Sequence, residues 1–223
     1  MIARQTTDGN GFLPRNTLKA RKLRLTANHM LAYILTFGRL VLAAALAAAV
    51  FFVSDRAGIS IAAAQALIAL AIAEELTDIF DGWAARRFGT VSSLGGILDP
   101  LIDSLSRCAI YFSMAYAGWI TPAVPLVMAA RDIIAAYARI ANASVGADTS
   151  ARFSGKFKAI IQGGGIPVVI ALAGGATCEA LGAAVVGALR LAVAGVLIVV
   201  TVWSMIDYII GAWPAAKEMM NTE

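Results

Sequence analysis

The sequence predicts an all-α integral membrane protein, built as a six-transmembrane-helix bundle. Hydrophobic residues make up 60% of the 223 residues and charged residues only 14%, whereas about a quarter of the residues of a soluble protein are charged. The apolar residues gather in six segments, and most of these reach the ~20 residues that a helix needs to cross a membrane. Glycine, proline and polar turns separate the segments. Lipid is therefore the expected solvent for most of the chain.

The six predicted spans follow a basic N-terminal arm. The arm, residues 1–28, is polar and shows no removable signal pattern; we expect either a juxtamembrane helix on the inner leaflet or a solvated tail. Residues 29–223 form one domain, with spans at Met30–Val53, Ile59–Trp83, Leu94–Ile120, Ala123–Ala143, Ala159–Gly174 and Ala183–Trp213. The fifth span is short and contains Pro167, so it either begins earlier or is kinked.

Basic residues predict the orientation of these spans, because short cytoplasmic loops hold an excess of Lys and Arg. One side of the arrangement carries Arg15, Lys19, Arg21, Lys22, Arg24, Arg86, Arg87, Arg152, Lys156 and Lys158. The opposing turns carry only Arg56. Both termini are therefore expected to be cytoplasmic, with a site cavity on the same side. The net charge of +4 fits an anionic membrane surface and not nucleic acid, because the basic residues are not interleaved with aromatic ones.

Acidic residues interrupt the second and third spans. The second contains Glu74, Glu75, Asp78 and Asp81, and the third contains Asp99, Asp103 and Arg107. Each charge costs at least ~2.5–3.5 kcal/mol at mid-depth, which makes these residues functional candidates. Helical spacing puts the aspartates of each span on one face, at similar depth below the inner surface. Four adjacent carboxylates need a cation, and oxygen ligands favour Mg²⁺ or Mn²⁺. Such an ion in turn suggests a pyrophosphate substrate.

The spacing of these residues resembles the signature of the CDP-alcohol phosphotransferase family. They read Asp78-x-x-Asp81-Gly82-x-x-Ala85-Arg86, then eight residues, then Gly95-x-x-x-Asp99-x-x-x-Asp103. The resemblance implies a metal site of Asp78, Asp81, Asp99 and Asp103, with Asp103 also the general base. It implies that the CDP-lipid contacts Asp78, Gly82, Ala85, Arg86 and Gly95, and that the protein is a homodimer. Two alternatives stay open: helix packing for the glycines and a boundary anchor for Arg86.

Three further stretches resemble bacterial phosphatidylglycerophosphate synthases: Ala130–Ile134, Gly155–Lys158 and Trp203–Tyr208. The resemblance implies a phospholipid-synthesis enzyme of the bacterial inner membrane. Such an enzyme moves the phosphatidyl group of CDP-diacylglycerol to glycerol 3-phosphate and releases CMP. Because an anionic acceptor needs fixed cations, we expect its phosphate to meet Arg131, Arg139, Arg152 and Lys156. Lys158 is expected to be an interfacial anchor.

Several alternatives remain. The same chemistry could use inositol phosphate, or phosphatidylglycerol as in eukaryotic-type cardiolipin synthases. A cation or proton transporter is disfavoured because the acids gather near one face and no inverted repeat is visible. Arg107 either compensates the acidic cluster or packs outward, Arg190 is expected to reach outward to the membrane surface, and the roles of Glu74 and Glu75 are open.

Overall fold

A computed structural model of the chain describes residues 37–54, 59–88, 95–147 and 152–222, without the side chains of residues 78–97. The N-terminal arm lies outside the described residues. Every regular element in these ranges is a helix, so the all-α prediction is confirmed. A helix at Phe37–Val53 comes first. It is followed by α2 (Ile61–Phe88), α3 (Gly95–Tyr116), α4 (Ala123–Ser144), α5 (Phe153–Ala173), α6 (Gly175–Leu181) and α7 (Ala183–Thr222).

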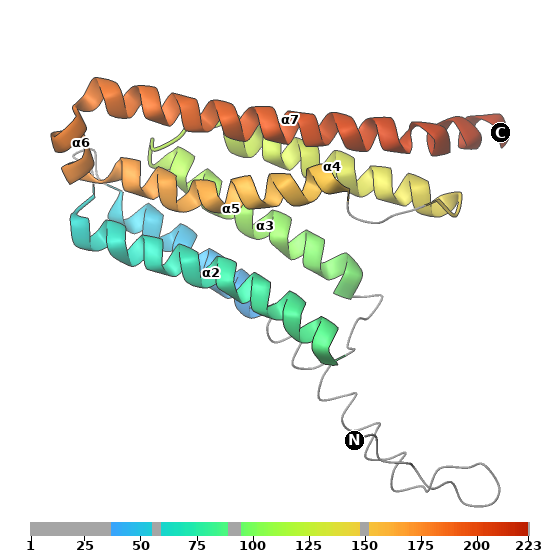
Figure 1. Cartoon of the computed structure of the whole chain (residues 1–223), viewed down its shortest axis with the longest axis horizontal. Coiled ribbons are helices and arrows are strands. Elements are labelled where there is room, and N and C mark those ends of the chain that lie inside the picture. The colour runs from blue at the N-terminus through green and yellow to red at the C-terminus, as the bar shows by residue number, and fades with distance from the viewer. Residues whose placement is uncertain (1–36, 55–58, 89–94, 148–151, 223) are drawn as a thin grey trace, which may run out of the picture.

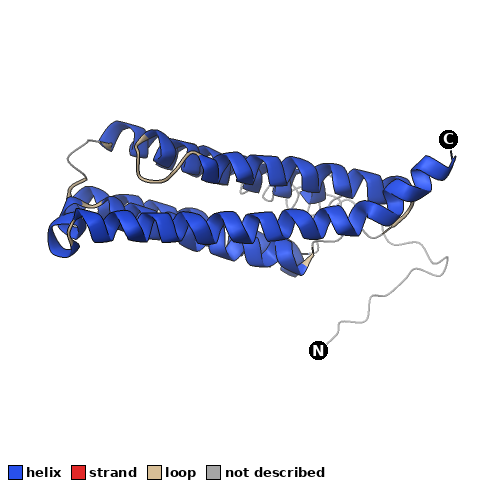
Figure 2. Cartoon of the chain, turned by 90° about the horizontal axis from the view of Figure 1, so that it is seen from above, coloured by secondary structure: helices blue, strands red, loops and turns tan. Residues whose placement is uncertain are grey.

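The long helices lie side by side and alternate in direction, so that α3 and α5 run the same way (Figure 1). The view from above shows the same lengthwise arrangement, with α7 extending along the whole bundle (Figure 2). Among the described helices, α4 packs most extensively against α7, and α5 packs against both α7 and α2. The short α6 caps one end. There, the amide of Gly175 donates to the carbonyl of Ile59 at 2.9 Å. This hydrogen bond connects the start of α6 to the residue that lies shortly before α2.

The helix boundaries differ from the predicted spans mainly near proline and glycine. α5 begins at Phe153, earlier than predicted, and continues through Pro167. α7 continues through Pro214 to Thr222. The predicted turn between Gly174 and Gly182 contains α6, which ends at Gly182 with a φ of +82°. A glycine with a positive φ is a common helix terminator because it has no Cβ to clash, but the sequence pattern predicted only a turn here, and the helix was missed.

Two described helices, α5 and α7, are long and apolar enough to cross a membrane, and the helix at Phe37–Val53 is a shorter apolar one. The outer surface of the described part is also rich in large apolar side chains, including Phe52 at 83% exposure and Leu191 at 71%. Exposed apolar surface on this scale marks a contact with membrane or protein. It therefore supports a bundle that faces lipid.

The apolar core fills the half of the bundle nearer α6. Its fully buried residues come from six helices and include Leu46, Tyr111, Met128, Ile170 and Leu197. The buried charged side chains lie mostly outside this apolar half: Arg39 and Lys158 stand in the first two turns of their helices, and Glu74, Arg107 and Arg131 stand nearer mid-helix.

Candidate active site

The predicted signature residues lie on α2 and at the beginning of α3. Asp78, Asp81, Gly82, Ala85 and Arg86 belong to the last turns of α2, and Gly95 is the first residue of α3. The side chains of these residues are outside the described part, so the structure does not test their predicted contacts.

Asp99 and Asp103 have described side chains on α3. They are one helical turn apart; Asp99 is exposed, and the Asp103 side chain is 28% exposed. Within the described residues, no three His, Cys, Asp or Glu side chains form a group that could hold a metal ion. Because Asp78 and Asp81 are not among those side chains, the predicted set of four remains a prediction.

Two buried arginines flank the carboxylate of Asp103. Arg107, one turn later on α3, places Nη2 3.1 Å from Asp103 Oδ1. Arg39, from the helix at Phe37–Val53, places Nη2 3.6 Å from the same oxygen. Each arginine is only 5% exposed. Arg107 therefore faces inward and compensates the acidic cluster, which resolves the choice that the sequence left open.

The two glutamates of α2 hold these arginines from the other side. Glu74 Oε1 lies 4.0 Å from Arg39 Nε, and Glu75 Oε2 lies 3.7 Å from Arg107 Nη2. Carboxylates and guanidiniums thus alternate across three helices. Sequence reasoning did not single out Arg39, although it is a charge within the first predicted span and the cost argument applied to the acids applies equally to it.

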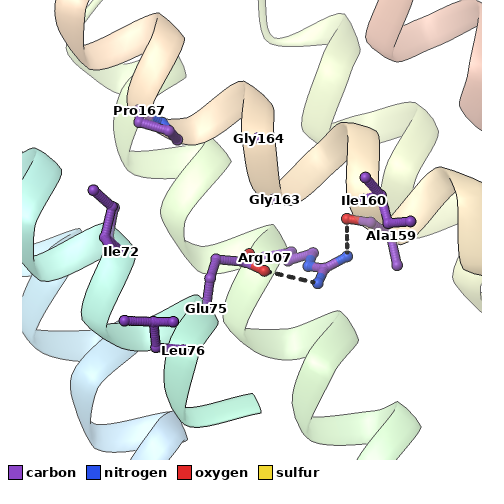
Figure 3. A pocket seen from close by; sticks show the side chains of 10 residues that line it. Ile72, Glu75, Leu76, Arg107, Ala159, Ile160, Gly163, Gly164 and Pro167 are labelled. Carbon is purple, nitrogen blue, oxygen red and sulfur yellow. Dashed lines mark hydrogen bonds and ion pairs between the residues drawn. The ribbon is translucent and has the colours of Figure 1, made fainter. Parts of the chain in front are cut away.

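A cavity of about 470 Å³ adjoins this network between α2, α3 and α5. Its lining is apolar except for the Glu75–Arg107 ion pair, as Figure 3 shows. Arg107 Nη1 also donates to the carbonyl oxygen of Ala159 on α5 at 2.9 Å. Gly163 leaves room for Glu75, since a Cβ at that position would lie 2.5 Å from Glu75 Oε1. An apolar groove therefore runs up to a charged pair that contacts Asp103.

A second polar cluster joins α4, α5 and α7. Arg131 donates from Nε and Nη2 to Ser204 Oγ at 3.1 and 2.7 Å and from Nη1 to Asp132 Oδ1 at 2.8 Å. Lys158 Nζ donates to the same Asp132 oxygen at 2.8 Å. The Lys158 side chain is 3% exposed, so the prediction that it anchors at the membrane surface is wrong. The side chain of its partner Asp132 is only 11% exposed, and the ion pair draws the lysine inward.

Arg139 and Arg152 line a cavity of about 590 Å³ beside this cluster. Arg139 Nη2 donates to the hydroxyl of Tyr208 at 3.0 Å, and Arg131 lies over the face of the same ring, 4.7 Å from its centroid. Arg152 Nε lies 3.0 Å from Asp207 Oδ2, which also accepts a hydrogen bond from Ser154 Oγ at 2.5 Å.

Three of the four predicted acceptor residues therefore gather around Tyr208 and this cavity. Lys156 does not join them: its side chain is exposed and does not line the cavity. Arg190 Nη2 donates to the carbonyl of Leu172, near the end of α5, at 2.8 Å, and its reach to the membrane surface stays a prediction.

The two clusters lie at the same level of the bundle. Arg107 on α3 meets Ala159 on α5, and the two helices run in the same direction (Figure 1). One turn earlier on each helix are Asp103 and Gly155. A Cβ at Gly155 would lie 3.2 Å from Arg131 Nη2. Acidic and basic groups therefore both adjoin the first turns of α5.

Comparison with known proteins matches this chain to one family. A model of the CDP-alcohol phosphatidyltransferase family matches residues 29–206. The chain belongs to this family. Membership confirms the resemblance drawn from the signature spacing, and it supports a transferase of the CDP-alcohol class that works in phospholipid biosynthesis at a membrane.

A curated relative in the same family is the archaetidylinositol phosphate synthase of Aeropyrum pernix. It is 34% identical over 94 residues, which cover 42% of this chain and 46% of that protein. The chain thus matches less than half the length of that relative. The family match itself ends at Ile206, so Asp207, Tyr208 and Gly211 of the cavity wall lie just beyond it.

Proposed function

We propose that the protein transfers the phosphatidyl group of CDP-diacylglycerol to a hydroxyl of glycerol 3-phosphate and releases CMP. The observation that carries this proposal is the pairing of two sites at one level of the bundle: a carboxylate cluster around Asp103 and a cavity lined by Arg139 and Arg152. The carboxylate cluster suits the reacting hydroxyl, and the arginine-lined cavity suits the acceptor phosphate. The product is phosphatidylglycerol phosphate.

Asp103 is the proposed general base. The acceptor hydroxyl oxygen attacks the phosphorus that carries the diacylglycerol, the bond from that phosphorus to the CMP oxygen breaks, and the hydroxyl proton passes to the Asp103 carboxylate. Partial exposure of Asp103, against the burial of its two arginine partners, leaves the carboxylate accessible to a substrate.

The donor set fits a hard divalent cation. Asp99 and Asp103 supply carboxylate oxygens on one face of α3, and Asp78 and Asp81 are proposed to complete the set from α2. Carboxylate oxygens without His or Cys are what Mg²⁺ and Mn²⁺ prefer. When bound, such an ion neutralises the charge of the pyrophosphate and improves CMP as a leaving group.

The lipid donor is proposed to enter from the side of the bundle. Its nucleotide would lie against the α2 and α3 termini, near Asp78, Gly82, Ala85, Arg86 and Gly95. The groove that ends at Glu75 and Arg107 has the apolar lining that an acyl chain requires. Its continuity with Asp103 through Arg107 supports this route.

The acceptor phosphate is proposed to bind between Arg139 and Arg152. Arg152 is the residue that precedes α5, so the partial positive charge of the helix N-terminus adds to that of the two guanidiniums. Arg131 contacts Tyr208 and Asp132, and we propose that it holds the Tyr208 ring in place in the cavity wall.

The membrane arrangement belongs to the same proposal. We place six spans in a bacterial inner membrane, with both termini and the site cavity on the cytoplasmic side, and we expect a homodimer. Three observations support it: the distribution of basic residues, the apolar outer surface, and the position of the buried charged side chains outside the apolar core cluster.

A second acceptor, inositol phosphate, is favoured by one observation: the Aeropyrum pernix relative is an archaetidylinositol phosphate synthase. Inositol phosphate also carries a phosphate and a hydroxyl, so the same two clusters would serve it. The two acceptors differ in the group attached to the phosphate, so the shape of the cavity beside the phosphate would select between them.

The test is CMP release from CDP-diacylglycerol by the purified protein in detergent micelles or lipid nanodiscs. Glycerol 3-phosphate, inositol phosphate, serine and phosphatidylglycerol are supplied in parallel, each with Mg²⁺, with Mn²⁺ and with a chelator. We expect release with glycerol 3-phosphate, its abolition by the chelator and its return with added metal. CMP release with inositol phosphate and with no other acceptor would mean that inositol phosphate, and not glycerol 3-phosphate, is the acceptor. The absence of CMP release with every acceptor would contradict the enzyme assignment.

A further inference from the structure

The carboxylate of Asp103 is contacted from two directions at a single oxygen. Arg107 Nη2 is 3.1 Å from Oδ1 and Arg39 Nη2 is 3.6 Å from it. Arg107 belongs to the same helix, whereas Arg39 comes from a different one. A carboxylate held by one neighbour can still turn about its own axis. A second contact from another helix restricts that rotation.

Both arginines are themselves held in place. Arg107 is fixed by Glu75 and by the carbonyl of Ala159, at 3.7 and 2.9 Å. Arg39 lies 4.0 Å from Glu74, which is only 3% exposed, so the contacts of Arg39 to Glu74 and Asp103 are ion pairs longer than a hydrogen bond. A buried guanidinium costs several kcal/mol in desolvation unless it is paired. The carboxylates of Asp103 and Glu74 offset this cost, so they stabilise Arg39 in its position beside Asp103.

We propose that Arg39 is a positioning residue for the reaction: together with Arg107 it fixes Oδ1 of Asp103, so that Oδ2 is turned toward the acceptor hydroxyl. This inference rests on the proposed function, in which Asp103 accepts the proton. Neither ion pair of Asp103 uses Oδ2. Since a misplacement of about 1 Å in a reacting group can cost about 100-fold in rate, loss of one clamp should lower turnover.

The experiment compares Arg39→Gln and Arg39→Lys with the wild-type protein in the CMP-release assay. Arg39→Gln keeps hydrogen-bonding atoms but loses the charge; we expect kcat to fall about 10- to 100-fold, with the KM of both substrates within about threefold. Arg39→Lys retains the charge and is expected to recover most of that loss. The matched control is Arg190→Gln, another arginine with a buried Nε, whose Nη2 contacts only the backbone carbonyl of Leu172 among the described residues. It should leave kcat unchanged.

Two readouts do not depend on turnover. Equilibrium binding of labelled CDP-diacylglycerol without acceptor should be the same for Arg39→Gln and wild type. Thermal unfolding of Arg39→Gln, Asp103→Asn and the double variant should be non-additive, because the two side chains share one contact.

Each outcome decides between the inference and its alternatives. If the wild type is active and the kcat of Arg39→Gln is within threefold of the wild-type value, this inference is overturned while the proposed function stands. The same follows if Arg39→Lys has a kcat no higher than that of Arg39→Gln. A loss confined to thermal stability, with unchanged kcat of the folded protein, assigns Arg39 to folding only. A wild type without metal-dependent CMP release overturns the proposed function, and the inference with it.

Discussion

The acidic and the basic cluster are built on opposite charge balances. Around Asp103 the described carboxylates outnumber the arginines, three against two: Glu74, Glu75 and Asp103, with Arg39 and Arg107. Around Tyr208 the cations outnumber the carboxylates, four against two: Arg131, Arg139, Arg152 and Lys158, with Asp132 and Asp207. Charge left over in a low-dielectric interior attracts a counter-ion. The excess negative charge beside Asp103 is consistent with the metal cation proposed to bind next to it, and the excess positive charge around Tyr208 is consistent with the proposed phosphate.

The clusters also differ in how tightly they are closed. Arg39 and Arg107 are buried against their partners, whereas the Arg152 side chain is 39% exposed beside an open cavity. A preorganised group suits a reacting centre, and an accessible cation suits a soluble ligand that must enter and leave. This division of roles predicts that substitutions in the acidic cluster lower turnover with every acceptor. Substitutions in the basic cluster are expected to lower kcat/KM only for acceptors that carry a phosphate.

The largest effect is expected for Asp103→Asn. The amide cannot accept the hydroxyl proton, so kcat should fall about 10²- to 10⁴-fold, equally for glycerol 3-phosphate and inositol phosphate if both react. Affinity for CDP-diacylglycerol, measured at equilibrium, should change little. Turnover close to that of the wild type would remove Asp103 from the role of base.

The next effect is expected for Arg139→Ala and Arg152→Ala. A charge-assisted contact to phosphate contributes about 1.5–3 kcal/mol, so kcat/KM for glycerol 3-phosphate should fall roughly ten- to a hundredfold. CDP-diacylglycerol binding should remain intact. Kinetics with each substrate varied separately would check this, and equal damage to both substrates would break the division of labour between the clusters.

A smaller effect is expected for Gly211→Ala, which tests the position of Arg152 without removing a charge. A Cβ at Gly211 would overlap Nη1 of Arg152, so the guanidinium must shift away from Asp207. We expect the KM for glycerol 3-phosphate to rise about three- to tenfold, which is less than the effect expected when Arg152→Ala removes the contact completely. The matched control is Gly195→Ala on the same helix, where a Cβ meets nothing within 4 Å. If both variants behave like the wild type, the observed place of Arg152 is unimportant for binding.

Much of the fold and the outline of the site were predictable because membrane helices follow simple rules. Apolar length and glycine breaks predicted α4 to within a residue of its observed end at Ser144. The spacing of the signature predicted the family. These features are local, and each is readable from one stretch of chain.

Contacts between distant stretches were not predictable in the same way. The pairing of Arg39 with Asp103 joins two helices far apart in sequence, and no spacing rule connects them. Similarly, Lys158 looked like a surface anchor because its partner Asp132 comes from another helix. The sequence placed both lysines of α5 near the membrane surface, but only the fold distinguishes the buried one from the exposed one.

The smallest effect is expected for Lys156→Ala, and it sharpens this distinction. Lys156 is exposed and does not line the cavity, and a solvated charge contributes only about 0.2–1 kcal/mol to a nearby ion. We therefore expect kcat/KM for glycerol 3-phosphate to fall by no more than about fivefold, with a flatter salt dependence because a screened contribution is lost. The same assay at low and high ionic strength measures both. A loss as large as that of Arg152→Ala would mean that the phosphate binds at the outer surface of α5 and not in the cavity beside Tyr208.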